Sequence, residues 1–184
     1  DALVYSHTLA LKFAQEQRKS FSDFEIELEP GIITGQKTIP VEKAGCYVPA
    51  GRFPLLSSVI MTVTPAVAAG VGEVIMCTPT RVHQDDVSES SKSGAGVPGK
   101  AFVGGKPYAD EGVMAAAYIC GVNHLYAVGG SQAIGAMAYG TESIPKVDVI
   151  VGPGNKYVAT AKKLVYGKVG IDMIAGPTEV MIIA

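Results

Sequence analysis

Short apolar runs alternate with helical segments from residue 57 to the end of this 184-residue chain, and this alternation strongly limits its possible folds. The expected strands cover residues 74–77, 125–128, 147–151 and 180–184. Apolar runs without polar alternation are typical of strands buried on both faces, as in a parallel sheet covered by helices. We therefore predict an α/β fold: an incomplete, doubly wound (Rossmann-like), mostly parallel sheet.

Three of the expected helices end at a glycine. They cover residues 110–120, 132–139 and 155–165, and are followed by Gly121, Gly140 and Gly167. Glycine readily takes the left-handed conformation that terminates a helix. In the last of these helices, the apolar face comprises Val158, Ala161, Leu164 and Val165.

The first helix of the alternating region is expected to contain an interruption. Ser57 or Ser58 can cap its N-terminus, and the helix runs from there towards Gly70. Pro65 lies inside this span and predicts a kink or two short helices, because proline lacks the backbone N–H that a helix interior needs.

The first 52 residues follow a different pattern. Residues 3–18 are predicted to be helical, and residues 24–28 alternate strictly between apolar and polar, which indicates a half-buried strand. Pro30-Gly31 predicts a turn from which residues 32–34 can pair back. We therefore divide the chain into an N-terminal helix and β segment (1–52) and a Rossmann-like α/β domain (53–184).

One segment interrupts the α/β domain. Residues 81–106 are rich in Ser, Gly, Asp and Lys and have almost no apolar period. The segment is far longer than an ordinary connection between a strand and a helix. We expect an exposed, mobile loop, with a lid as the alternative.

Composition excludes several classes of protein. Hydrophobic residues make up 48% and charged residues 17% of the chain, and the formal net charge is -2. This balance is unlike that of disordered chains. The charge also gives no sign of the basic surface that a nucleic-acid-binding protein needs. No apolar stretch approaches the ~18 residues of a membrane span. Three scattered cysteines, Cys46, Cys77 and Cys120, are expected to be small buried side chains in a reducing compartment.

Two glycine-rich turns follow expected strands and begin expected helices. The first glycine turn is Gly129-Gly130-Ser131-Gln132 and the second is Gly152-Pro153-Gly154-Asn155. Glycines allow close backbone approach, and free N–H groups at a helix N-terminus favour an anion such as pyrophosphate. The Gln132 and Asn155 amides can orient ribose hydroxyls or a carboxamide. Tight connections without a ligand are the alternative, and no G-x-G-x-x-G fingerprint is present.

Other chemistries receive less support. Ser131 lies between a strand and a helix, as a hydrolase nucleophile does, but His7, His83 and His124 all precede it, so the order Ser, acid, His is impossible. The histidines lack metal-ligand spacing, and the run His83-Gln84-Asp85-Asp86 falls in the 81–106 loop. We predict no catalytic and no metal-binding residue in this chain, and a structural role for His124.

Five motifs together resemble those of the histidinol dehydrogenase family in order and approximate spacing. They are residues 45–49 (GCYVP), 129–133 (GGSQA), 139–148 (YGTESIPKVD), 152–155 (GPGN) and 171–180 (IDMIAGPTEV). The resemblance implies a zinc-dependent, NAD-linked oxidation of L-histidinol, through the aldehyde, to L-histidine, the last step of histidine biosynthesis. It also implies a cytoplasmic homodimer that acts on a small molecule, without nucleic acid or membrane.

The resemblance assigns roles to four residues. It implies NAD contacts for Tyr47, Gln132 and Asn155, and Thr178 stands where the family has a substrate-contacting serine. The family's zinc ligands and its Glu-His base pair lie beyond the position matching Ala184, so we expect this chain to be inactive alone.

Two alternatives remain open. Related dehydrogenases act on other small alcohols such as sulfonated diols, and Thr178 in place of serine is compatible with such a substrate. In the second alternative, the chain is a fragment that binds a nucleotide and has no catalytic role. In either case the apolar run 180–184 is expected to promote self-association as an exposed strand.

Overall fold

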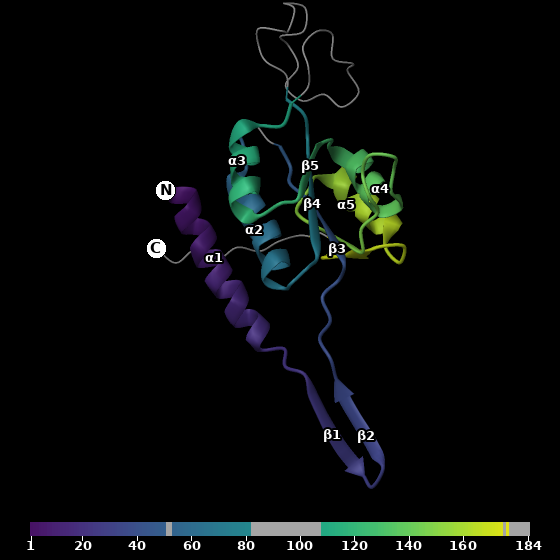
Figure 1. Ribbon diagram of the computed structural model, residues 1–184. Helices are drawn as coiled ribbons and strands as arrows, with labels where there is room; N and C mark the ends of the chain where they lie inside the picture. Colours follow the sequence, from purple (N-terminus) through teal and green to yellow (C-terminus); the bar gives the residue numbers. More distant parts are fainter. Residues whose placement is uncertain (51–52, 82–107, 175, 177–184) are drawn as a thin grey trace, which may run out of the picture.

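The computed structural model describes residues 1–50, 53–81, 108–174 and 176. Within these residues, a five-stranded parallel sheet has helices on both faces (Figure 1). Its strands are β3 (Lys43–Tyr47), β4 (Glu73–Thr78), β5 (His124–Ala127), β6 (Val149–Val151) and β7 (Gly170–Ile171). The helices that alternate with them are α2 (Leu56–Ala68), α3 (Glu111–Cys120), α4 (Gly130–Tyr139) and α5 (Lys156–Val165). The predicted α/β class is confirmed.

The strand order, β5-β4-β3-β6-β7, is that of a doubly wound sheet. The chain enters the sheet in the middle at β3, continues outward through β4 to β5, and then returns to β6 and β7 on the other side of β3. The direction of strand addition therefore reverses between β3 and β6. In open α/β sheets this reversal leaves a crevice at the C-terminal strand ends, where ligands bind.

The two faces of the sheet bury different side chains of the same strands. Cys46, Val74 and Met76 pack towards α2 and α3, whereas Tyr47, Ile75 and Cys77 pack towards α4 and α5. Residues 74–77 are 2% exposed or less. Because both faces of β3 and β4 are covered, these strands lack the polar alternation of a sheet with one wet face.

The glycine signals end the helices as predicted. Helices α3, α4 and α5 end at Cys120, Tyr139 and Val165. The glycines that follow, Gly121, Gly140 and Gly167, have φ values of +83°, +80° and +89°. Asp110 begins α3 by accepting hydrogen bonds from the N–H groups of Gly112 (3.0 Å) and Val113 (3.3 Å).

The prediction for α2 was wrong about the cap and about two short helices. The helix begins at Leu56, without a side-chain cap from Ser57 or Ser58, and it is one helix with Pro65 inside it. Pro65 lies in the last turn and removes the one intrahelical hydrogen bond that its N–H would have donated. Burial of Val63 and Thr64, both 0% exposed, holds this part of the helix in place. Tertiary packing therefore outweighs the local effect of proline.

The N-terminal helix α1 (Ala2–Lys19) lies against α2. The ring Nδ1 of His7 is 3.1 Å from the Thr64 hydroxyl, and Arg18 donates to the Ala68 carbonyl (3.3 Å). Of the helices that the structure describes, none combines the length and apolar character needed to cross a bilayer.

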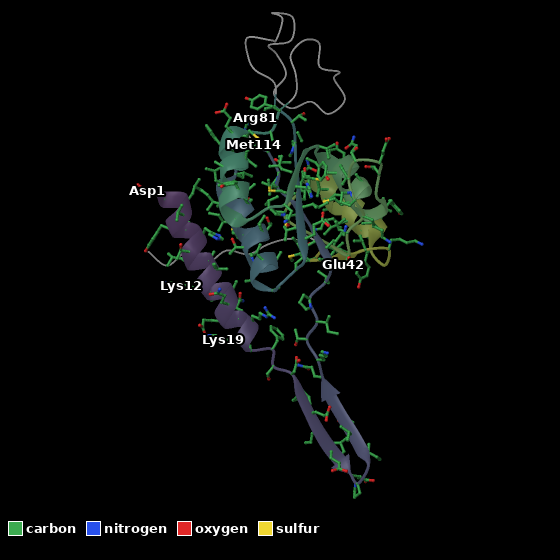
Figure 2. The ribbon with its side chains drawn as sticks, viewed as in Figure 1. Asp1, Lys12, Lys19, Glu42, Arg81 and Met114 are labelled. Atoms are coloured by element: carbon green, nitrogen blue, oxygen red, sulfur yellow. The ribbon has the colours of Figure 1, made fainter. Side chains whose placement is uncertain are left out.

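The predicted hairpin forms, but it is not half-buried. Strands β1 (Phe24–Glu29) and β2 (Ile32–Gln36) pair antiparallel around Gly31, which has a φ of +85°. Every residue of both strands is exposed. The hairpin extends away from the sheet and its side chains point into open space (Figure 2). Alternation along a strand predicts an amphipathic surface, but it does not determine whether that surface packs on the same chain.

The buried face of α5 also differs from the prediction. Leu164 is 77% exposed, whereas Lys162 is 4% exposed. Val158 and Val165 are buried as expected. A lysine therefore takes an inward position that an apolar residue would ordinarily occupy.

Replacing Ile150 with alanine is expected to lower the free energy of unfolding by about 2–5 kcal/mol, because its side chain is 0% exposed in the sheet. The matched control is Leu164→Ala, which should change this free energy by less than about 0.5 kcal/mol. Urea denaturation followed by circular dichroism measures both. A loss of similar size for Leu164→Ala would show that Leu164 is buried after all.

Candidate functional site

The predicted nucleotide-binding residues all lie at the C-terminal edge of the sheet. Tyr47 is the last residue of β3, the first glycine turn follows β5, and the second follows β6. Strands that run in one direction all end at one edge of the sheet. The fold therefore brings both turns to the same edge as Tyr47.

Tyr47 joins the first glycine turn to the centre of the sheet. Its side chain is buried, and its hydroxyl oxygen accepts a hydrogen bond of 3.0 Å from the Gly130 N–H at the start of α4. Burial raises the pKa of this hydroxyl, while the hydrogen bond from Gly130 acts in the opposite direction. The hydroxyl therefore stays neutral at physiological pH and serves as a fixed acceptor.

Tyr47 also contacts the second glycine turn through its backbone. A Cβ atom placed on Gly152 would lie 2.1 Å from the Tyr47 carbonyl oxygen, and the φ of Gly152 is +125°. No other residue type fits this position without displacing the backbone. The close approach of Gly152 thus determines how β6 leaves the sheet beside β3.

Gln132 stands at an open part of the first turn. Its side chain is exposed, and its Oε1 accepts a hydrogen bond of 3.3 Å from the Ser131 hydroxyl. A Cβ on Gly130 would lie 2.9 Å from the Gln132 Oε1, and the φ of Gly130 is +69°. Glycine is therefore favoured at this position, and the exposed Gln132 side chain lies beside the Gly130 backbone.

Asn155 has a structural role that the sequence analysis did not anticipate. Its Oδ1 accepts hydrogen bonds from the N–H groups of Tyr157 (3.0 Å) and Val158 (3.2 Å) and thereby caps α5. The amide oxygen is occupied by this cap, so only the amide nitrogen remains for another partner.

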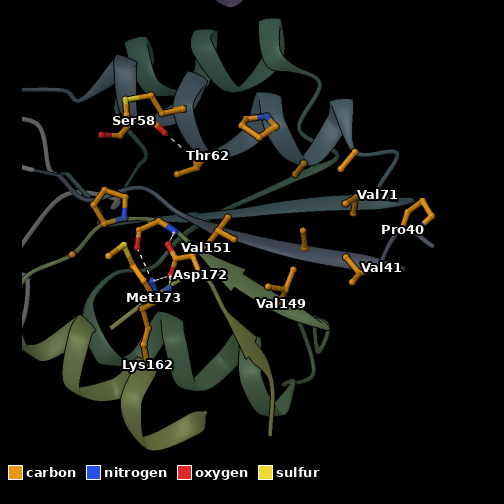
Figure 3. A pocket seen from close by; sticks show the side chains of 18 of the residues that line it. Pro40, Val41, Ser58, Thr62, Val71, Val149, Val151, Lys162, Asp172 and Met173 are labelled. Carbon is orange, nitrogen blue, oxygen red and sulfur yellow. Dashed lines mark hydrogen bonds and ion pairs between the residues drawn. The ribbon is translucent and has the colours of Figure 1, made fainter. Parts of the chain in front are cut away.

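Two hollows adjoin these turns. One of about 340 Å³ lies along α5 from Lys156 to Leu164 and reaches Ser131 in the first turn of α4. The other is an apolar groove of about 750 Å³ that runs from Pro40 past Val149 to Asp172 (Figure 3). The smaller hollow lies beside the predicted amides, whereas the groove reaches the second turn from the α2 side.

An ion pair with a buried lysine at the second turn was missed by the sequence analysis. Lys162 of α5 pairs with Asp172, which follows β7 and is partly exposed (Figure 3). An inward lysine within an amphipathic helix gives no local signal of burial, so only the sheet geometry reveals its partner.

The remaining predictions concern metals, cysteines and Thr178. Among the residues that the structure describes, no three His, Cys, Asp or Glu side chains gather as a metal site. His124 is exposed, with Nε2 3.7 Å from the Glu73 carboxylate. The cysteines are buried, and burial raises the pKa values of Cys46 and Cys77 to about 12. Thr178, the expected strand 180–184 and the expected loop after residue 81 lie outside the described residues.

Comparison with known proteins identifies the family. The family model for histidinol dehydrogenase matches residues 1–97 and 95–184. The chain belongs to the histidinol dehydrogenase family. The two matched parts meet inside the 81–106 segment.

Individual relatives agree with this assignment. Histidinol dehydrogenase of Aquifex aeolicus is 49% identical over 95% of this chain and 36% of that protein. Sulfopropanediol 3-dehydrogenase of Ruegeria pomeroyi is 43% identical over 98% of this chain and 36% of that protein. The crystal structure of histidinol dehydrogenase from Elizabethkingia anophelis has a TM-score of 0.74 and 32% identity, and covers 97% of this chain and 36% of that one. The chain thus spans about a third of these relatives' length.

Tyr47→Phe should destabilise the chain by about 1–3 kcal/mol, because the Gly130 N–H loses its acceptor in a partly buried place. Hydrogen exchange of the Gly130 amide should become faster at the same time. Tyr139→Phe on α4 is the control, since Tyr139 is 63% exposed. An unchanged hydrogen-exchange rate of the Gly130 amide in Tyr47→Phe would contradict the proposed importance of this hydrogen bond.

Proposed function

We propose that the protein containing this chain is a zinc- and NAD-dependent dehydrogenase that oxidises L-histidinol to L-histidine. In this proposal the present chain supplies the NAD-binding side of the active site and does not reduce NAD by itself. The protein acts as a homodimer in the cytoplasm. Family membership supports the reaction class, and the meeting of both glycine turns at Tyr47 supports the placement of NAD.

The observation that carries the proposal is the open edge at the first glycine turn. Gln132 is exposed beside the Gly130 backbone, and α4 begins there. We assign to the Gln132 amide the binding of ribose hydroxyls or the carboxamide of NAD. The Asn155 amide nitrogen has the same role at the second turn. When bound, NAD supplies the acceptor for the hydride removed from the alcohol.

The described residues do not fit a zinc site. They lack a group of three or more His, Cys, Asp or Glu side chains placed to hold one metal ion. We therefore assign no catalytic step to zinc on this part of the chain. Thr178 is proposed to contact the substrate, on the basis of its motif alone.

A second candidate function is the oxidation of a sulfonated diol. The Ruegeria relative named sulfopropanediol 3-dehydrogenase is 43% identical over 98% of this chain, similar to the histidinol dehydrogenases. The nucleotide-binding role of Tyr47, Gln132 and Asn155 is common to both candidates, so they differ in the substrate only.

Calorimetric titration of this chain with NAD tests the cofactor role. Gln132→Ala and Asn155→Ser should each weaken binding by about three- to tenfold, as expected for a lost hydrogen bond. Serine can still cap α5 through its hydroxyl, so Asn155→Ser separates the amide from the cap. The control is Gln15→Ala, an exposed glutamine of α1. Equal affinity in all four proteins, or no binding in any, would refute the placement of NAD.

Assays of the full-length protein decide between the two substrates. With zinc and NAD present, L-histidinol should support NAD reduction at a kcat/KM well above that for sulfopropanediol. The present chain alone should be inactive with both. A preference for sulfopropanediol would favour the second candidate function over the first. NAD reduction by the present chain alone would overturn the assignment of catalysis to the rest of the protein.

A further inference from the structure

The ion pair between Lys162 of α5 and Asp172 after β7 binds both backbone polar groups of a single glycine. Lys162 donates to the Gly152 carbonyl oxygen at 2.9 Å, and the Gly152 N–H donates to Asp172 Oδ2, also at 2.9 Å. The two charged groups bond to each other through Asp172 Oδ1, which also accepts from the Met173 N–H at 2.7 Å. Both backbone polar groups of Gly152 are therefore held by one pair of opposite charges.

This arrangement is not explained by stability alone. Lys162 is 4% exposed, so its ammonium group is largely removed from water, whereas the Asp172 side chain is 32% exposed. Desolvation of the lysine offsets much of the attraction, and apolar residues of similar volume often serve the fold equally well at a buried position. An apolar side chain at this position could not, however, bond to the Gly152 carbonyl oxygen.

Gly152, which these hydrogen bonds fix in place, is the first residue of the second glycine turn. Pro153, Gly154 and Asn155 follow it and are exposed, so Gly152 anchors the turn at its strand end, while the Asn155 cap anchors it at the α5 end. Gly152 is also pressed against the Tyr47 backbone, where a Cβ would lie 2.1 Å from a carbonyl oxygen. Strand β3, the residue after β7 and the middle of α5 thus all meet at one residue.

We propose that Lys162 and Asp172 are a positioning pair that fixes the second glycine turn in the conformation that binds the dinucleotide. The inference rests on the proposed NAD-binding function and deepens it. Neither side chain contacts the cofactor in this proposal. They act through Gly152, whose N–H and carbonyl they hold, and so set where Asn155 presents its amide nitrogen.

The test is calorimetric titration of the full-length protein with NAD. Lys162→Met keeps the volume and removes the charge, and the dissociation constant for NAD should rise on the order of tenfold with an unchanged number of sites. Lys163→Met is the matched control, because Lys163 is the exposed neighbour on α5. It should bind NAD as the unaltered protein does.

Asp172→Asn gives an independent variant in case Lys162→Met does not fold. It keeps an acceptor for the Gly152 N–H and removes the negative charge, and it should also weaken NAD binding. The double variant should bind no more weakly than the poorer single variant, because the two residues act as one unit. Additive losses would contradict a shared role.

The number of sites separates positioning from general destabilisation. A merely structural role would lower the number of binding sites, because less protein is folded, while the remaining sites keep their dissociation constant. That result, or unchanged binding in both single variants, would overturn the inference. Failure of the unaltered protein to bind NAD would instead refute the proposed function, and this inference with it.

Discussion

The contact between Gly152 and Tyr47 determines much of the geometry of this domain. Strand β3 lies in the middle of the sheet, and the strand order reverses beside it. A side chain at residue 152 would collide with the Tyr47 carbonyl, at 2.1 Å. The Tyr47 hydroxyl meanwhile accepts the Gly130 N–H. One residue of β3 therefore sets the position of both glycine turns, and with them the only two amides that the sequence analysis selected.

Charged groups and apolar packing stabilise different parts of the structure around the contact between Gly152 and Tyr47. The two core clusters hold the sheet between α2 and α3 on one face and α4 and α5 on the other, and they are almost wholly aliphatic. The Lys162–Asp172 pair lies at the C-terminal edge, where backbone groups of an irregular turn need partners. Apolar burial is roughly proportional to area and has no direction, whereas these hydrogen bonds fix the orientation of individual backbone groups.

Local sequence signals predicted the structure more accurately than signals that depend on tertiary contacts. Glycine stops and non-alternating apolar runs are local, and they located α3, α4, α5, β4 and β5 closely. The expected break at Pro65 and the expected burial of the hairpin were wrong, because both depend on what other elements cover. The buried Val63 and Thr64 keep α2 continuous, and no described element covers the hairpin strands.

The sequence by itself determined the α/β class, the glycine turns, the two amides and the family resemblance, since these follow from residue type and spacing. Only the tertiary structure decided that Tyr47 is buried and bonded to Gly130, that Asn155 caps α5, and that Lys162 faces inward instead of Leu164. These facts depend on which residues from distant parts of the chain meet at one edge of the sheet. The helical period of α5 places Lys162 and Leu164 about 200° apart, on nearly opposite faces, so that burying one exposes the other, and the carboxylate of Asp172 and the carbonyl of Gly152 provide the partners for the lysine.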